Sequence, residues 1–188
     1  MAIVSIKNKT KSGSLLVGNA GFFPNSYESI QTINVTTPVT SVTFTSIPST
    51  YTHLQIRMTT KDNTGLASQS IRINSDSGAN YAWHRTVGTG SGTAASTGLS
   101  SQNQAIIGIS DAQFGNTIMD ILDYKNTNKY KTIKSLSGFD NNGSGWIGQW
   151  SGLWINTAAI TDIQIMTGLL SQAWTQYSTF ALYGIKVA

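Results

Sequence analysis

Two histidines are the first candidates for catalysis, because imidazole is the commonest general base in enzymes. His53 lies in the string YTHL and His84 in the string AWHR, each beside an aromatic residue in a stretch with strand periodicity. Serines are abundant, so a serine nucleophile activated by one of these histidines is conceivable, but the chain has no G-x-S-x-G pattern. We therefore expect both histidines to be structural, and the sequence predicts no catalytic residue.

The eight carboxylates are the second candidates, since a glycosidase needs two of them facing each other across the bond it cleaves. Asp120 and Asp123 lie three residues apart in a predicted strand, so their side chains should point to opposite faces. Asp62, Asp76 and Asp140 lie in turn sequences, where aspartate commonly bonds to its own backbone. We expect no catalytic pair among them and no enzymatic activity.

One string has the spacing of a calcium-binding loop. In DNNGSG, the residues Asp140, Asn142 and Ser144 occupy the first, third and fifth positions of an EF-type loop, and Gly145 the sixth. The twelfth position is Ser151, which cannot replace the bidentate glutamate of such a loop. Zinc-ligand spacing is also missing, and the chain has no cysteine. The sequence therefore predicts a hairpin turn at DNNGSG, without a metal or a cofactor.

Three of the five tryptophans lie within nine residues, in the string GSGWIGQWSGLWIN. In a strand, Trp146, Trp150 and Trp154 share one face with the intervening glycines, and the opposite face ends in Leu153 and Ile155. Two interpretations follow: an exposed platform that stacks on sugar rings, or indoles buried in the core or in a subunit interface. Because the opposite face is apolar too, we expect a strand covered on both sides near its end, and favour burial.

Lysines gather in two places. Lys129, Lys131 and Lys134 surround Tyr130, with the first two on one strand face and the third on the other. They form either a solvated strand face or a contact with an acidic partner surface. At the other place, Lys7, Lys9 and Lys11 make the leading segment basic, and leave nine basic and eight acidic side chains in residues 12–188.

The rest of the chain shows the period-two alternation of half-buried antiparallel strands. About ten or eleven strands are predicted, at 26–36, 41–47, 53–61, 69–74, 81–87, 104–110, 116–124, 130–137, 146–155, 160–167 and 178–187. Residues 168–176 form at most a marginal turn of helix, and residues 88–102 lack the large apolar side chains that would pack. These features predict an all-β protein, an antiparallel β-sandwich of jelly-roll type.

The first 26 residues do not follow this pattern, and we expect them to form an extended N-terminal arm before a single β-sandwich domain at 27–188. The arm would hold a partner through its lysines and its apolar side chains, namely Lys7, Lys9, Lys11, Leu15, Leu16, Phe22 and Phe23.

Composition narrows the functional class. Charged residues make up 11% of the chain, against about 25% in ordinary soluble domains, which favours a protein that packs against copies of itself or a larger assembly. The nearly neutral body does not predict nucleic-acid binding. No stretch approaches the roughly 20 apolar residues of a membrane helix, and the first residues do not follow the order of a secretory signal.

Several strings together resemble a group of small virion structural proteins of tailed bacteriophages. They are IPSTYTHLQIR (47–57), GANYAWHR (78–85), NKYKTIKSLSG (128–138), SGLWINTAAIT (151–161) and FALYGIK (180–186). The resemblance covers most of the chain beyond about residue 40. It implies a jelly-roll or sandwich protein without enzymatic activity, assembled in the host cytoplasm and exposed on the virion.

Two placements in the particle follow from this resemblance. A capsid decoration (cement) protein would bind the major capsid protein, as a homo-oligomer and most often a trimer, without contacting nucleic acid or membrane. A tail or head fibre domain would instead recognise a bacterial surface glycan. The basic arm before a neutral sandwich favours the first placement, on the capsid surface. Polar loops and the tryptophan series favour the second.

Overall fold

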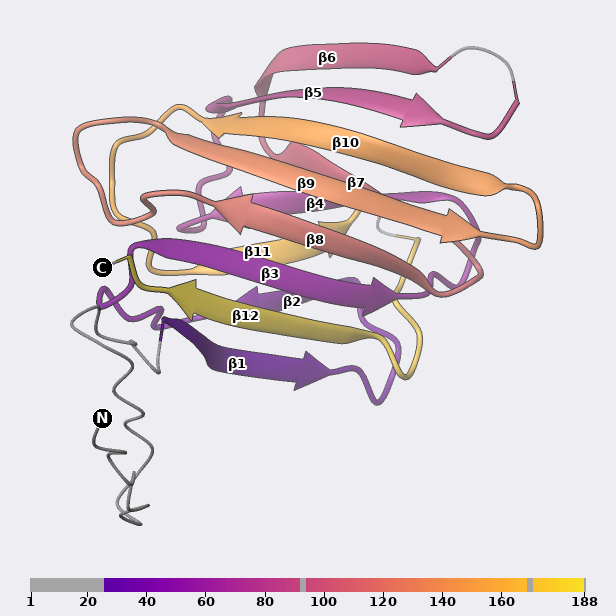
Figure 1. The fold of residues 1–188 in the computed structure, drawn as a ribbon, viewed down its shortest axis with the longest axis horizontal. Coiled ribbons are helices and arrows are strands. Elements are labelled where there is room, and N and C mark those ends of the chain that lie inside the picture. The colour runs from indigo at the N-terminus through magenta and orange to yellow at the C-terminus, as the bar shows by residue number, and fades with distance from the viewer. Residues whose placement is uncertain (1–25, 92–93, 169–170, 188) are drawn as a thin grey trace, which may run out of the picture.

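The computed structural model describes residues 26–91, 94–168 and 171–187, which form two antiparallel β-sheets and contain no helix (Figure 1). No helix in this part of the chain is therefore long and apolar enough to cross a membrane. The all-β prediction is confirmed. The strands are β1 (Tyr27–Asn34), β2 (Ser41–Phe44), β3 (His53–Thr60), β4 (Ala67–Ile73), β5 (Tyr81–Gly88), β6 (Ala95–Gln102), β7 (Ala105–Ser110), β8 (Gly115–Ile121), β9 (Lys131–Asp140), β10 (Gly145–Trp154), β11 (Ile163–Thr167) and β12 (Thr179–Ile185).

The larger sheet has eight strands in the order β1-β12-β3-β8-β9-β10-β5-β6, and the smaller has four in the order β2-β11-β4-β7. In Figure 1 the smaller sheet lies behind the larger one, while β5 and β6 lie at the top edge. Two sheets stacked with a shared apolar interior are the arrangement of a β-sandwich.

The core lies between the sheets because most strands alternate inward apolar and outward, more polar residues. In β3, for example, Leu54, Ile56 and Met58 are buried while the residues between them are more exposed. Most buried apolar residues form one large cluster that draws on both sheets and includes Phe44, Trp154, Trp174 and Phe180. A second, small cluster consists of Val87, Ile109, Phe139 and Trp150.

A buried polar network joins the two sheets. Gln69 of β4 donates to the hydroxyl of Thr60 (2.7 Å) and accepts from that of Thr117 (2.8 Å). The Thr117 hydroxyl also lies 2.7 Å from Ser137 Oγ, which exchanges hydrogen bonds with the backbone of Ile109 in β7. Buried polar groups are tolerated when each has such a partner, so the network fixes how β8 and β9 sit over the smaller sheet.

Two sequence expectations need correction. Residues 95–102 were expected in a structureless loop, but they form β6, paired with β5. This edge strand is mostly exposed, so its backbone pairing does not require large apolar side chains. Residues 171–176 form no helix; instead Trp174 makes isolated bridges to Val39 and Asp62. The expected arm at 1–26 lies, except for its last residue, outside the described residues.

Candidate binding face

The outer face of the eight-stranded sheet, turned away from the smaller sheet, presents a continuous set of side chains across seven strands. The register aligns Ser29, Tyr183, Gln55, Asp120, Lys134, Ser151 and His84 in one row from β1 to β5. A second row contains Arg57, Ile118, Leu136, Gln149 and Thr86. Because β-strand side chains alternate, these residues all point to the same side.

An apolar hollow of about 540 Å³ occupies one end of this face, over β8, β9 and β10. Its large apolar side chains are exposed: Ile118 by 42%, Leu136 by 47% and Ile147 by 63%. Ile147 pairs with Gly138 on one side and Gly88 on the other, so no side chain covers it laterally. A Cβ at Gly138 would lie 2.7 Å from the carbonyl oxygen of Trp146, which explains the glycine.

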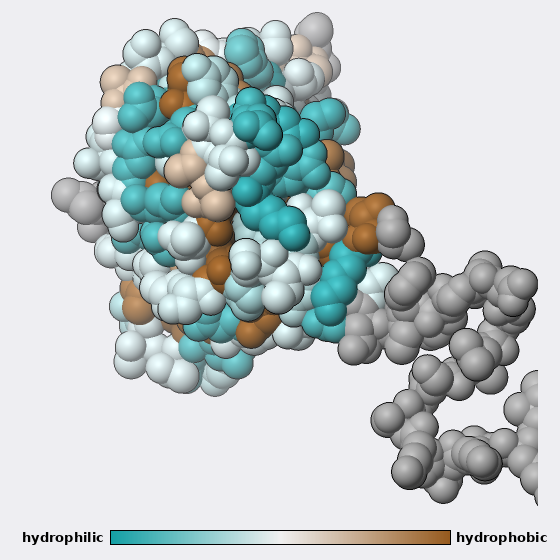
Figure 2. Space-filling model, turned by 90° about the vertical axis from the view of Figure 1, so that its left-hand side faces the viewer, coloured by the Kyte–Doolittle hydropathy of each residue, from teal (hydrophilic) through white to brown (hydrophobic). Residues whose placement is uncertain are grey.

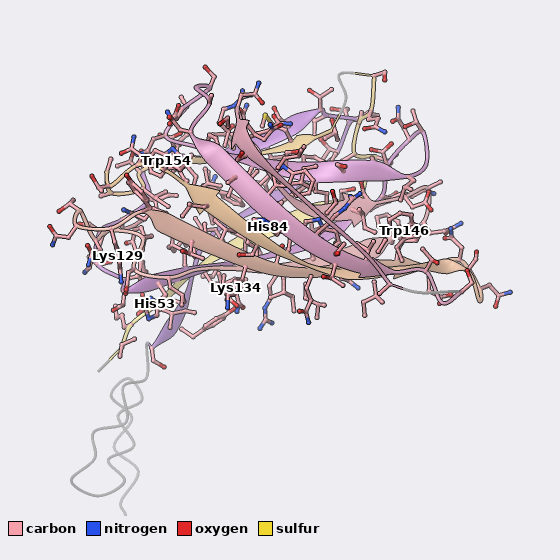
Figure 3. All side chains as sticks on the ribbon, turned by 90° about the horizontal axis from the view of Figure 1, so that it is seen from above. His53, His84, Lys129, Lys134, Trp146 and Trp154 are labelled. Atoms are coloured by element: carbon pink, nitrogen blue, oxygen red, sulfur yellow. The ribbon has the colours of Figure 1, made fainter. Side chains whose placement is uncertain are left out.

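A polar hollow of about 640 Å³ lies beside it, over β9, β10, β5 and β6. Its lining includes His84, Lys134, Gln149 and Ser151, and no carboxylate. The imidazole of His84 lies so close to Gly98 of β6 that a Cβ there would overlap its ring. Figure 3 labels His84 and Lys134 on their strands. Imidazole, ammonium, amide and hydroxyl groups together can hydrogen-bond a polyhydroxylated or anionic ligand.

An aromatic and cationic cluster lies at the β1 side of the face. The rings of Tyr27 and Tyr183 stack with centroids 4.9 Å apart, and the Arg57 guanidinium lies 5.6 Å and 5.8 Å from them. Gln55 accepts from the Tyr27 hydroxyl and donates to Asp120. Desolvation raises the pKa of Tyr27 above its ordinary value, so this phenol stays neutral at physiological pH. Ring stacking and hydrogen bonds among its own side chains therefore hold this cluster together.

The indoles of Trp150 and Trp154 are buried, whereas Trp146 lines the apolar hollow. Trp154 is 1% exposed and Trp150 is 3% exposed, while Trp146 is half-buried at the other end of β10 (Figure 3). An indole buried between sheets cannot stack on a sugar, so Trp150 and Trp154 form no exposed platform. On the opposite face, Leu153 is half-buried but Ile155 is 39% exposed, so the chain itself only partly covers this end of the strand.

The two buried indoles differ in their polar contacts. Trp154 Nε1 donates to Asp76 Oδ2 at 2.7 Å, and this bond is the main reason that the pKa of Asp76 lies below its ordinary value. Trp150 Nε1 has no hydrogen-bond partner among the described residues.

The remaining histidine and carboxylate candidates have structural contacts. His53 Nδ1 accepts from the backbone N–H of Asp123 at 3.0 Å. Asp123 is paired with Lys129, whose hydrogen bond lowers the pKa of that carboxyl. Asp120 lies within β8, whereas Asp123 follows the end of that strand with a positive φ of 50°. Among the described residues no group of three or more histidine, aspartate or glutamate side chains could hold a metal ion.

The lysine cluster separates more than expected. Lys134 lies on the outer face, but Lys131 is only 1% exposed, and its ammonium donates to the carbonyls of Asn126, Lys129 and Thr157. Burial lowers the pKa of Lys131 below its ordinary value. Lys131 therefore does not belong to a solvated face, because three carbonyls replace its water.

Two further features complete the comparison with the sequence. DNNGSG forms the β9–β10 hairpin turn, with Asp140 paired to Gly145 and positive φ at Asn142 and Gly143, as predicted. The end of the molecule at the left of Figure 1 is largely hydrophilic, with small scattered hydrophobic spots (Figure 2). The arm residues Lys7, Lys9, Lys11, Leu15, Leu16, Phe22 and Phe23 lie outside the described residues.

Sequence alone did not reveal the two hollows. The signal that could have located them is the pair of outward apolar residues, Leu136 and Ile147, opposite the inward face of their strands. Comparison of the chain with protein-family models, with curated proteins and with solved structures gave no match.

Proposed function

We propose that this protein is a non-enzymatic structural protein of a tailed-phage virion, a capsid decoration protein whose outer sheet face binds the major capsid shell. The apolar hollow carries this proposal. Ile118, Leu136 and Ile147 expose large apolar surfaces side by side, and a surface of this kind is stabilised when another protein covers it. The basic arm at residues 1–26 supplies a second contact with the shell.

The finer topology of the fold belongs to the same proposal. Eight of the strands pair symmetrically about the β4–β7 pair: β3 with β8, β2 with β11, and β1 with β12. Such wrapping of one long hairpin is the arrangement of a jelly roll, a fold used in viral capsids and lectins. In this description β9, β10, β5 and β6 extend the sheet of β8.

The chemistry of the surface supports an assembly role. Few charges need partners when such a surface is covered, since charged residues are only 11% of the chain. The protein would act as a homo-oligomer, with a trimer expected from the family resemblance, on the capsid surface after assembly in the host cytoplasm. It would require no cofactor, nucleic acid or membrane.

The polar hollow favours a second candidate, a fibre or receptor-binding domain for a bacterial surface glycan. His84, Lys134, Gln149 and Ser151 offer donors and acceptors in one hollow of about 640 Å³. Stacking on tryptophan is no part of this version, since Trp150 and Trp154 are buried.

One experiment separates the two candidates. The full chain and two variants, Ile147→Asp in the apolar hollow and Lys134→Ala in the polar hollow, are tested for binding to undecorated capsids and to a bacterial polysaccharide array. We expect Ile147→Asp to weaken capsid binding at least tenfold, because the new charge must be desolvated on docking. Leu122→Asp is the matched control, since Leu122 is 56% exposed outside the hollow.

Three results would overturn all or part of this proposal. If Ile147→Asp binds capsids as the parent does, the hollow is not the contact, and the proposed docking face is overturned. Polysaccharide binding lost in Lys134→Ala, without capsid binding by any form, favours the receptor-binding role. Undiminished capsid binding after deletion of residues 1–20 removes the arm from the proposal.

A further inference from the structure

Each sheet ends in two edge strands, and such edges are sites of unwanted pairing unless they are protected. The edges are β1 and β6 in the larger sheet and β2 and β7 in the smaller one. Three of them carry a protective feature. Among the described edge strands, only β6 has no protective feature along most of its length.

The β7 edge is closed by side chains of the opposite sheet. Ser135 Oγ donates to the carbonyl of Ile107, and Ser137 Oγ both donates to the carbonyl of Ile109 and accepts from its N–H, each at 3.1 Å. The backbone groups that a new strand would use are therefore already bonded.

The other two protected edges use different means. β1 has a bulge between Ser29 and Gln31, and Glu28 near its start is paired with Lys186 at 3.2 Å. β2 has only four residues, Ser41–Phe44. Charges, bulges and short length are the usual ways in which natural proteins prevent edge pairing.

β6 has the sequence ASTGLSSQ, with no charged residue and no proline. It is exposed along most of its length, and β5 is its single strand partner among the described residues. Its own bulge lies near the end, between the residues that pair with Tyr81 and Trp83, so Ala95–Leu99 remains regular. A regular, neutral, exposed edge is suited to accept another strand.

We propose that β6 pairs antiparallel with β6 of a second copy of this chain, across a two-fold axis perpendicular to the sheet. Such an axis places the strand against itself, so that the middle residue, Thr97, lies near Thr97 of the other copy. A neutral strand meets no like charge in this arrangement. A charged partner strand would find no opposite charge on β6, which favours the second copy.

The size of the contact sets its strength. Five regular residues extend about 17 Å, so the interface is at the small end of specific contacts and predicts weak, concentration-dependent association. This inference does not depend on the proposed function. If the protein also forms a trimer through other surfaces, each β6 contact would link two trimers.

Charge at Thr97 provides the test. Thr97 pairs with Arg85 of β5, so Thr97→Glu gains a favourable neighbour within the hairpin while placing two carboxylates close together across the two-fold axis. We expect analytical ultracentrifugation of the full chain to show pairing that rises with concentration, and Thr97→Glu to weaken it at least tenfold. Mixing Thr97→Glu with Thr97→Lys should restore pairing, because each contact then joins opposite charges.

The matched control is Thr32→Glu on the β1 edge, an exposed position paired with Ala181. It should leave pairing unchanged. The proposal is overturned if the full chain shows no paired species up to millimolar concentration, if Thr97→Glu pairs as the parent does, or if the mixture fails to restore pairing. Circular dichroism of each variant confirms that the sheets are intact.

Discussion

The eight strands that pair symmetrically and the other four differ in the surface that they present to solvent. The eight that pair symmetrically, β1 to β4, β7, β8, β11 and β12, supply most of the large apolar cluster. The other four, β5, β6, β9 and β10, carry the polar hollow, most of the apolar hollow and the unprotected edge.

The difference indicates a division of roles within one sheet. A strand buried on its inner face contributes to stability wherever it lies, but an outward apolar residue such as Ile147, 63% exposed, contributes little to the isolated fold. Binding surfaces are commonly built on a stable framework in this way. Substitutions in the eight strands should therefore affect stability most, and those on the outer face of the four should affect binding.

The largest expected effect compares two phenylalanines. Phe180 of β12 is fully buried, with its ring 4.6 Å from that of Trp174, and Phe180→Ala should cost about 3–5 kcal/mol of unfolding free energy. Phe139 of β9 belongs to the small cluster and lines the apolar hollow. Phe139→Ala should cost less, about 2 kcal/mol, because water can enter the space from the hollow.

Urea unfolding of both variants measures the two costs. Equal costs, or a larger cost for Phe139→Ala, would contradict the proposed division between the eight symmetrically pairing strands and β5, β6, β9 and β10. Phe139→Ala should also weaken the binding of any ligand to the apolar hollow, because Phe139 lines it.

The sequence was informative about strands and less so about their surroundings. Eleven predicted stretches overlap every strand except β6, because alternation of apolar and polar residues is the direct consequence of one buried face. β6 has no such alternation, since both of its faces are largely exposed and only its backbone pairs. The predicted ten or eleven strands therefore fall short of the twelve that the structure describes.

The tryptophan strand shows a second limit. Its period correctly placed Trp150 and Trp154 together on one face, and the structure buries them. The apolar residues that end its other face, Leu153 and Ile155, suggested a strand covered on both sides near its end, yet within this chain Leu153 is half-buried and Ile155 is exposed. An apolar face predicts that something covers it, but the pattern does not distinguish the chain itself from a partner. The hollow depends on residues brought together from β8, β9 and β10, which no local pattern contains.

A medium effect is expected from the two indoles of β10. Trp154→Phe removes the hydrogen bond to the Asp76 carboxylate and should cost about 2 kcal/mol. Trp150→Phe removes a buried N–H that has no partner among the described residues, so relief of that unsatisfied group offsets the lost packing. We expect a change within about 1 kcal/mol. If the two variants unfold at the same urea concentration, the hydrogen bond from Trp154 to Asp76 does not contribute to the stability of the fold.

The smallest effect is the acid sensitivity that this bond creates. The hydrogen bond from Trp154 is the first cause that lowers the pKa of Asp76 below 3.8, so the folded state holds this carboxyl ionised more firmly than the unfolded chain does. The resulting stability is present above about pH 4 and is lost as the pH falls through the folded pKa. Trp154→Phe should remove most of this dependence, so the stability difference between the parent and the variant should shrink between pH 6 and pH 2.5. Because Asp76 is partly exposed, we expect a reduction of about 1 kcal/mol or less, measured by urea unfolding at both pH values. Trp150→Phe provides the control, since its indole contacts no titratable group through Nε1, and its difference from the parent should be the same at both pH values.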